Sequence, residues 1–313
     1  MTLLVADADA IARAAIAIRS GALVIMPTET VYGLAADATD PVAVARIYAA
    51  KGRPIFNPLI SHVLSLQDAE RQARFHPVAR QLAERFWPGA LTLVAPRLVD
   101  SDIAELACGG LSSVALRAPA HPVARALLEL AGVPLAAPSA NRSGKLSSTS
   151  ATHADEELGD AVSIVLDAGP CALGLESSVV AVGVDGAATL LRPGAITRAE
   201  IEAVIGPLAA VSASQTPTSP GMLSSHYAPR AQLRLNAAAP APGEAFLAFG
   251  PSAPNGALNL SERGDLVEAA ANLFAHLRRL DAMGVEVIAV APVPHEGLGE
   301  AINDRLSRAA AGR

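Results

Sequence analysis

Hydrophobic positions in the first two thirds of the chain alternate between helical spacing and short apolar runs, so helices and strands are expected to follow one another. A helix is expected over 9–19, and the apolar run 22–26 after Gly21 has the length of a buried strand. Further helices are expected at 41–50, 65–74, 77–86, 122–131 and 197–205. Further strands are expected at 59–63, 91–95, 133–137, 163–166, 177–182 and 188–191, and another β-like run ends at Arg117.

The pattern changes after Pro207. Ser, Thr, Ala and Pro dominate up to Pro229, with almost no charge, which is typical of a linker. Beyond it, two strands (245–249 and 285–291) alternate with two helices (265–281 and 298–309), and such alternation favours a parallel sheet. We therefore expect domains over 1–206 and 234–313, joined by a linker over 207–233.

Composition narrows the functional class. With 313 residues, of which 51% are apolar, the chain is long enough to give two domains a core each. The net charge of −6 argues against a broad electrostatic grip on nucleic acid, and no apolar run approaches the roughly 18 residues of a membrane span. Cys108 and Cys171 form no disulfide framework, and no basic signal segment opens the chain, so a cytoplasmic protein without a membrane anchor is expected.

Two polar loops flank the predicted helix 41–50. The first, 27–33, places the hydroxyls of Thr28 and Thr30 at the end of a predicted strand. The second, 51–58, holds Lys51, Arg53 and Asn57 between Gly and Pro, which suits it to wrapping an anion such as a triphosphate. Taken alone, two basic residues are more often ordinary solvated charges. The chain has neither a Walker A nor a dinucleotide fingerprint, so any nucleotide site is of another type.

Other candidate residues stand at predicted strand ends. Arg117 and Arg192 each lie beside a Pro, where a charge needs an anion or water. His62 is isolated, which favours a structural role, and no His or acid lies at metal-ligand spacing from it. Ser139, Asn141 and Ser147 suit turn formation as well as binding. Nothing resembles a Ser/His/Asp triad or a carboxylate pair, so covalent catalysis is not expected.

The motifs coincide, in order, with those of a known family. They are Pro-Thr-Glu-Thr-Val-Tyr-Gly-Leu at 27–34, Lys-x-Arg-Pro-x-x-Asn-Pro-Leu at 51–59, Arg-x-Pro at 117–119, Ala-Pro-Ser-Ala-Asn at 137–141, Glu-Ser-Ser at 176–178, Leu-Arg-Pro-Gly at 191–194 and the stretch 219–229. The chain thus resembles the L-threonylcarbamoyladenylate synthases in their two-domain form. The resemblance implies an α/β fold: a YrdC-like twisted mixed sheet with flanking helices, followed by a small Rossmann-like α/β domain.

The resemblance also implies an activity. Members of this family form threonylcarbamoyl-AMP and pyrophosphate from L-threonine, bicarbonate or CO₂, and ATP, with Mg²⁺ held mainly by the ATP phosphates. Such a reaction needs two anions aligned and neutralised rather than a protein nucleophile. The product would pass to a threonylcarbamoyl-transfer machinery that acts on tRNA, and stable tRNA binding by this chain is not expected.

Position by position, the resemblance assigns roles to the motif residues. Threonine would be held by Thr30, His62, Arg117, Ala137 and one of the two serines Ser177 and Ser178. ATP would be held by Lys51, Arg53, Asn57, Ser113, Ser139, Asn141, Ser147, Arg192 and Tyr227. Lys51 and Arg53 would be catalytic, and no residue would be a metal ligand. Because Tyr227 stands in the linker, segment 207–233 is expected to act as a lid over the active site.

Two other readings remain open from the sequence. One is a binding module for structured RNA, against which the acidic balance weighs. The other is a different carbamoyl-transferring enzyme that shares the first domain. That enzyme would need zinc-finger or acylphosphatase-like segments, and two cysteines are too few for the former.

Overall fold

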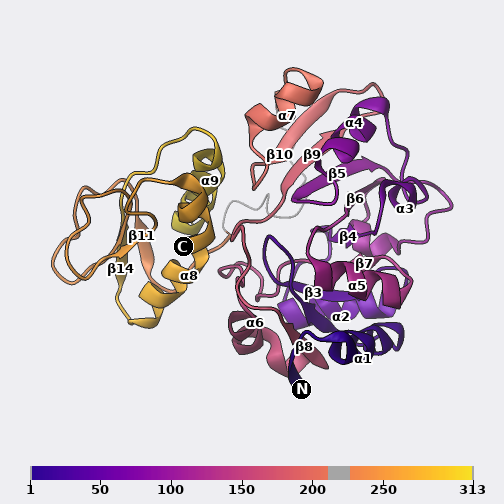
Figure 1. Cartoon of the computed structure of the whole chain (residues 1–313), viewed down its shortest axis with the longest axis horizontal. Coiled ribbons are helices and arrows are strands. Elements are labelled where there is room, and N and C mark those ends of the chain that lie inside the picture. Colours follow the sequence, from indigo (N-terminus) through magenta and orange to yellow (C-terminus); the bar gives the residue numbers. More distant parts are fainter. Residues whose placement is uncertain (1, 211–225, 312–313) are drawn as a thin grey trace.

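The computed structural model describes residues 2–210 and 226–311, and the chain forms a larger N-terminal and a smaller C-terminal domain that lie side by side (Figure 1). Each domain is built on its own sheet, of ten and four strands respectively. Residues 211–225, which hold most of the predicted linker and the first part of the 219–229 motif, lie outside the described residues.

The larger sheet is mixed, as expected. In spatial order its strands are β1 (Thr2–Val5), β8 (Ile164–Asp167), β2 (Val24–Met26), β3 (Gly33–Asp37), β7 (Leu135–Ala136), β4 (Ile60–His62), β6 (Ser113–Arg117), β5 (Leu91–Pro96), β9 (Ser178–Val182) and β10 (Ala188–Arg192). Its two faces carry separate cores: Val24 and Met26 belong to one apolar cluster and Ile25, between them, belongs to the other. This alternation is what a strand buried on both faces requires.

Helices cover both faces of that sheet. They are α1 (Ala8–Arg19), α2 (Pro41–Lys51), α3 (Leu66–Glu70), α4 (Pro77–Phe86), α5 (Pro122–Ala131), α6 (Ala151–Leu158) and α7 (Arg198–Ile205), with short 3₁₀ turns η1 (Glu105–Cys108) and η2 (Gly159–Ala161). Their starts follow from local chemistry: Asp40 caps α2 by accepting from the Val42 amide at 2.8 Å, and Thr197 forms a capping box with Glu200. Helix α1 packs beside α5, and α4 beside α7.

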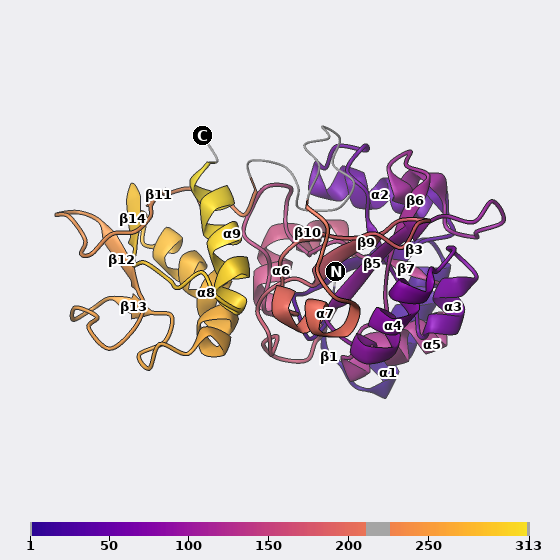
Figure 2. The same cartoon turned by 90° about the horizontal axis from the view of Figure 1, so that it is seen from above.

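The smaller sheet is parallel throughout, as the βαβα pattern predicts. Its order is β11 (Gln232–Arg234), β14 (Val287–Val290), β12 (Ala245–Ala248) and β13 (Leu258–Asn259). Helices α8 (Leu266–Ala282) and α9 (Leu298–Ala310) lie between this sheet and the larger domain (Figure 2). The short strands β11 and β13 were not predicted, and β11 begins inside the segment expected to be linker.

Several first-domain elements differ from their predictions. The strand expected over 133–137 pairs only at Leu135–Ala136, because Pro134 and Pro138 have no amide hydrogen to donate. The helix expected over 65–74 ends at Glu70, and Ala73 instead forms a bridge with Arg97. Strands β1 and β3 and helix α6 were not predicted. Strand β3 reads Gly-Leu-Ala-Ala-Asp, which lacks the β-branched and aromatic residues typical of strands.

The two domains share an apolar contact. Leu146 and Leu175, both from loops of the larger domain, are buried in the core of the C-terminal domain with residues of α8 and α9. Gly174 allows this approach, since a Cβ atom there would lie 2.6 Å from the Cα of Ala271 in α8. The two domains therefore pack against each other directly beside the Glu-Ser-Ser motif.

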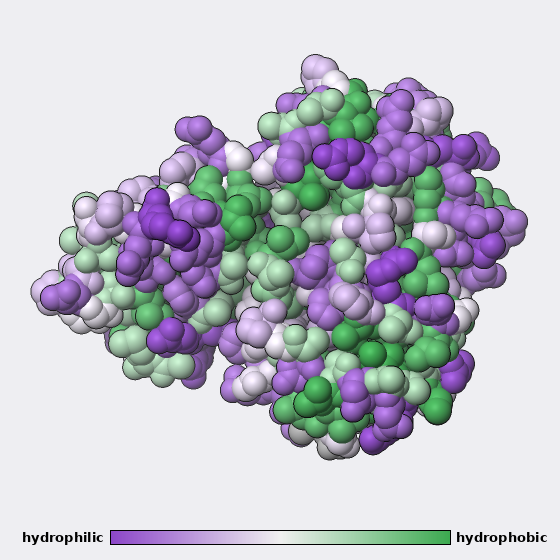
Figure 3. Space-filling model, viewed as in Figure 1, coloured by the Kyte–Doolittle hydropathy of each residue, from purple (hydrophilic) through white to green (hydrophobic). Residues whose placement is uncertain are grey.

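Hydrophilic and hydrophobic side chains are interspersed over both domains on the face shown in Figure 3. None of the helices in 2–210 and 226–311 combines the length and the apolar character that a membrane crossing requires.

Candidate active site

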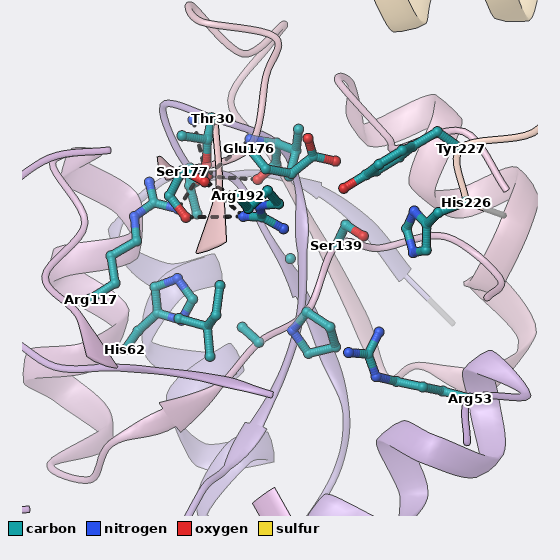
Figure 4. A pocket seen from close by; sticks show the side chains of 16 residues that line it. Thr30, Arg53, His62, Arg117, Ser139, Glu176, Ser177, Arg192, His226 and Tyr227 are labelled. Atoms are coloured by element: carbon teal, nitrogen blue, oxygen red, sulfur yellow. Dashed lines mark hydrogen bonds between the residues drawn. The ribbon is translucent and has the colours of Figure 1, made fainter. Parts of the chain in front are cut away.

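The polar loops at the strand ends converge on one cavity of about 40 Å³ (Figure 4). The topology explains part of this convergence, because β4 and β6 are parallel neighbours whose register sets His62 beside Arg117. Ser139 is brought to the same place by a bridge to Gly33 at the start of β3. In Figure 4, Arg117 and His62 lie on one side of the cavity and Arg53, His226 and Tyr227 on the other.

Arg117 forms a fixed positive charge on one side of the cavity. Its side chain is 4% exposed, and its guanidinium donates to Thr30 Oγ1 at 2.8 Å and to the carboxylate of Glu29 at 2.6 Å. Burial opposes ionisation of Glu29, but the charge and hydrogen bond of Arg117 outweigh it and lower the pKa of that carboxyl below its usual value. Glu29 therefore stays ionised at neutral pH and orients Arg117 beside Thr30.

His62 is a neutral imidazole in this site. Its burial, and then the nearby charge of Arg117, lower its pKa to about 3. Within the described part of the chain, its Nδ1 atom and the hydroxyl of the preceding Ser61 have no hydrogen-bond partner. A buried polar atom of this kind is suited to a small polar ligand.

Arg53 forms the positive charge at the other end. Its guanidinium is held on the inside of its own loop, where it donates to the side-chain and backbone oxygens of Asn57 at 2.7 and 3.1 Å and to the Pro58 carbonyl at 2.8 Å. Gly52, in the left-handed conformation at φ 60°, ends α2 and turns the chain into this loop. Burial lowers the pKa of Arg53 to about 10, so the group remains a cation at neutral pH.

Lys51 bonds to a neighbouring loop in this structure. Its ammonium donates to the backbone oxygens of Ser139, at 2.6 Å, and Asn141, and its side chain is not part of the cavity lining. Burial, followed by the charge of Arg53, lowers its pKa well below the usual value. In this structure Lys51 thus ties the 51–58 loop to the 139–141 loop, and its predicted contact with phosphate stays a prediction.

Glu176 lines the cavity and was not among the predicted site residues. One carboxylate oxygen accepts from Ser147 Oγ, and the other accepts from Arg305 Nε of helix α9 at 2.9 Å. Burial opposes its ionisation, but the charges of Arg305 and Arg192 prevail and lower its pKa to about 2. The motif Glu-Ser-Ser at 176–178 was the sequence signal that pointed to it.

Arg192 and Ser177 are locked together at the back of the cavity. The guanidinium of Arg192 donates to the Ser177 carbonyl at 2.8 Å, and Ser177 Oγ lies 2.7 Å from Thr92 Oγ1. Gly194 makes this fit possible, because a Cβ atom there would lie 2.4 Å from the amide nitrogen of Ser178. The Leu-Arg-Pro-Gly motif therefore ends in glycine for a steric reason.

The structure distinguishes the two adjacent serines of the Glu-Ser-Ser motif. Ser177 lines the cavity, whereas Ser178 donates its hydroxyl to the Ile196 carbonyl. The predicted residues that line the cavity are Thr30, Arg53, His62, Arg117, Ala137, Ser139, Ser177, Arg192 and Tyr227. Those outside its lining are Lys51, Asn57, Ser113, Asn141, Ser147 and Ser178, whose ligand contacts stay predictions. Ser113 starts β6, at the opposite end of the strand from Arg117.

Tyr227 closes the Arg53 end of the cavity from outside the larger domain. It is 1% exposed, with its ring 5.6 Å from that of Phe274 and 5.0 Å from the guanidinium carbon of Arg305. The ring of His226 packs edge-on against that of Tyr227, with the ring centres 4.0 Å apart. His226 also lines the cavity, although only Tyr227 was predicted to be a site residue. Tyr227 has φ 61°, a left-handed conformation that costs a non-glycine residue about 1–2 kcal/mol. Its packing must offset that cost.

The arrangement suits the binding of anionic groups at two ends. Two buried cations face the cavity from opposite sides, and the described residues contain no group of three or more His, Cys, Asp or Glu side chains that could hold a metal ion. The two cations can therefore neutralise and align anions.

Comparison with known proteins identifies the family. A family model described as "Telomere recombination" matches residues 16–194, and the model "Threonylcarbamoyl-AMP synthase, C-terminal domain" matches residues 196–311. The chain is 39% identical to a threonylcarbamoyl-AMP synthase of Bacillus subtilis, over 97% of this chain and 93% of that protein. The chain belongs to the threonylcarbamoyl-AMP synthase family. Members of this family are nucleotidyltransferases.

A further relative and a solved structure agree. The threonylcarbamoyl-AMP synthase of Pyrococcus abyssi is 42% identical over 93% of this chain and 91% of that protein. The crystal structure of P. abyssi Sua5 complexed with L-threonine superposes with a TM-score of 0.88 at 40% identity, covering 96% of this chain and 94% of that one. The expected fold, a mixed sheet with helices followed by a small parallel-sheet domain, is thereby confirmed.

Proposed function

We propose that this chain joins L-threonine, bicarbonate or CO₂, and ATP into threonylcarbamoyl-AMP and pyrophosphate. The observation that carries the proposal is the placement of two buried cations, Arg117 and Arg53, at opposite ends of one cavity. The full-length similarity to threonylcarbamoyl-AMP synthases supports the same conclusion.

Threonine binds at the Arg117 end in this proposal. The guanidinium, already aligned by Glu29 and Thr30, receives the carboxylate, and the neutral His62 contacts the polar groups of the amino acid. Ser177 and Ala137 complete this end, which deepens the predicted set by choosing Ser177 over Ser178. The amine of threonine takes up CO₂ to form a carbamate and releases a proton.

ATP binds at the Arg53 end. Arg53 and Arg192 neutralise the phosphates, while Ser139, on the loop that Lys51 holds in place, faces the same space. A carbamate oxygen attacks the α-phosphorus, the bond to the β-phosphate oxygen breaks, and pyrophosphate leaves. No protein nucleophile is needed, since alignment and charge neutralisation lower the barrier.

We infer that Mg²⁺ enters this site with ATP, as expected from the sequence. Glu176, which lines the cavity, and Glu29, which pairs with the lining residue Arg117, are each committed to an arginine. This donor set does not suit an all-protein metal cage but is compatible with an ion whose main ligands are phosphate oxygens and water. The ion would add positive charge beside the phosphates.

The segment 207–233 acts as a lid in our proposal, joining domains over 1–206 and 234–313. A cavity of about 40 Å³ has room for only a few water molecules, so ATP requires the lining to move. His226 and Tyr227 are the lining residues that follow the larger domain in sequence, and they are the side chains best placed to withdraw and return.

The lid predicts a specific role for the Tyr227 ring. We expect Tyr227→Ala to raise the KM for ATP about tenfold, because the aromatic surface that closes the nucleotide end is lost. Steady-state pyrophosphate release measures it. Tyr227→Phe keeps the ring and is expected to change KM less than about threefold, because the hydroxyl has no hydrogen-bond partner among the described residues. Equal losses in both variants would contradict this role.

The product is a reactive mixed anhydride, so we propose that it passes promptly in the cytoplasm to a transfer machinery that modifies tRNA. Because the transfer machinery consumes the product, we do not expect this chain to bind tRNA stably. A net charge of −6 also disfavours strong binding to nucleic acid.

The decisive experiment measures pyrophosphate release and the threonine adduct of AMP with each substrate omitted in turn. We expect turnover only when threonine, bicarbonate and ATP are all present. Turnover that is indifferent to threonine would exclude the proposed reaction. Tight, salt-dependent binding of structured RNA without any threonine-dependent turnover would instead favour an RNA-binding module.

A further inference from the structure

We infer that Arg305, on helix α9 of the C-terminal domain, is a positioning residue for the ATP site: it holds and neutralises the Glu176 carboxylate so that phosphates can enter beside it. This inference rests on the proposed function, because it names a residue of the C-terminal domain on which the same site depends.

The contacts of Arg305 fix its guanidinium. The side chain is 1% exposed, and its Nε donates to the Glu176 carboxylate at 2.9 Å. Its Nη1 donates to the neighbouring Asp304 at 2.6 Å. Its guanidinium carbon lies 5.0 Å from the centre of the Tyr227 ring, within cation–π distance. Arg305 thus touches both the wall of the cavity, through Glu176, and the residue that closes it.

The charge of Glu176 makes this contact important for anion binding. Glu176 lines a cavity proposed to hold a triphosphate, and an unneutralised carboxylate there would repel the phosphates. The charge of Arg192, from the first domain, also acts on Glu176, and both arginines lower the pKa of this carboxyl. Arg305 is the arginine that neutralises Glu176 at hydrogen-bond distance, 2.9 Å.

The backbone around Glu176 depends on the same domain. Leu175, immediately before Glu176, and Leu146, immediately before its partner Ser147, are both buried in the core that α8 and α9 form. Gly174 packs against the backbone of Ala271 in α8. The C-terminal domain therefore packs against both loops that carry the Ser147–Glu176 hydrogen bond. Arg305 adds an ion pair to this apolar contact.

The test compares three variants of the full chain by ATP titration and by steady-state kinetics. We expect Arg305→Met to weaken ATP binding and raise its KM about 30-fold, because Glu176 loses its neutralising partner. Threonine binding, at the far end of the cavity, is expected to change less than about twofold. The double variant Glu176→Gln/Arg305→Met is expected to regain at least about fivefold in ATP affinity over Arg305→Met, because the repelling charge is gone.

Arg308→Met is the matched control. Arg308 is one turn further along α9 and pairs with Asp304 at 2.9 Å, so its removal takes the same charge from the same helix without touching Glu176. We expect its KM for ATP to stay within about twofold of wild type. An equal loss in Arg308→Met and Arg305→Met would overturn the inference, because it would indicate a general effect of charge on α9.

A structural role alone would give a different result. If Arg305→Met lowered threonine and ATP affinity together, or if Glu176→Gln failed to restore ATP affinity, the inference would be wrong. If Arg305→Met does not fold, Arg305→Lys keeps the charge without the guanidinium fork, and the same rescue by Glu176→Gln is not expected for it. Direct ATP titration keeps the outcomes separate: absence of turnover in the wild type would refute the proposed function, while the titrations would still decide the role of Arg305.

Discussion

Arg53→Ala is expected to lower kcat/KM for ATP by about 1,000-fold, the largest effect of any substitution at the nucleotide end. The buried guanidinium supplies positive charge to the cavity and also holds the 51–58 loop in shape through Asn57 and Pro58. Alanine removes the charge and leaves the oxygens of Asn57 and Pro58 without this donor. Pyrophosphate release under saturating threonine and bicarbonate measures the effect.

The controls for Arg53 separate charge from geometry. Arg53→Lys keeps a cation but cannot reach both Asn57 oxygens and the phosphates at once, so an intermediate loss of about 30-fold is expected. Arg13→Ala removes a surface arginine that is half-exposed and pairs only loosely with Asp9, at 3.9 Å, and should leave the kinetics within about twofold. Retention of most of the activity by Arg53→Ala would show that the phosphates are held elsewhere.

The parts of the fold that could be predicted are those with strong local signals. Helix α2 starts at Asp40-Pro41 and ends at a left-handed Gly52, and each of these residues specifies its backbone conformation within a single turn. Strand β3 escaped prediction because alanines carry little strand preference, and the strand is specified by its neighbours β2 and β7 instead.

The candidate site could be predicted where its residues lie in dense motifs at strand ends. Arg117 and His62 were both expected to contact threonine. The parallel register of β4 and β6 places the two residues side by side. The role of Lys51 was harder, because it depends on backbone oxygens 88 and 90 residues away. A basic residue next to a glycine gives no local sign that its donors are already used.

The contribution of the C-terminal domain could not be predicted at all. Arg305 and Glu176 are separated by 129 residues, and neither sequence neighbourhood indicates that the other exists. Leu146 and Leu175 are apolar residues in polar loops, and nothing local tells whether such a residue belongs to its own domain or to the next. These contacts are set by how the two domains pack.

The second large effect is expected at the opposite end of the cavity. Arg117→Ala should weaken threonine binding by at least about 100-fold, because a fixed, charge-assisted carboxylate partner is lost. Calorimetric titration with threonine, in the presence of ATP, measures it. ATP binding should change less than about threefold, since Arg53 lies on the opposite side of the cavity (Figure 4).

The same substitution should also destabilise the fold, since Glu29, which is 13% exposed, would remain largely buried without its partner. Breaking a buried ion pair of this kind costs about 3–5 kcal/mol, and denaturant unfolding measures the loss. Because the folded-state pKa of Glu29 is lowered, its stabilising contribution in the wild type is present above the usual carboxyl pKa and is lost as the pH falls through the lowered value. In Arg117→Ala the dependence should reverse, because desolvation then dominates and protonation of Glu29 relieves the cost of burying its charge.

Two variants separate the loss of threonine contact from the loss of stability. Glu29→Gln/Arg117→Ala removes the uncompensated carboxylate, so it should recover most of the unfolding free energy while threonine binding stays weak. Arg125→Ala, on α5, removes an arginine that bonds the Leu64 carbonyl at 3.1 Å and does not line the cavity, and should leave threonine affinity within about twofold. If the double variant regained threonine binding together with stability, Arg117 would act by holding the fold rather than by receiving the carboxylate.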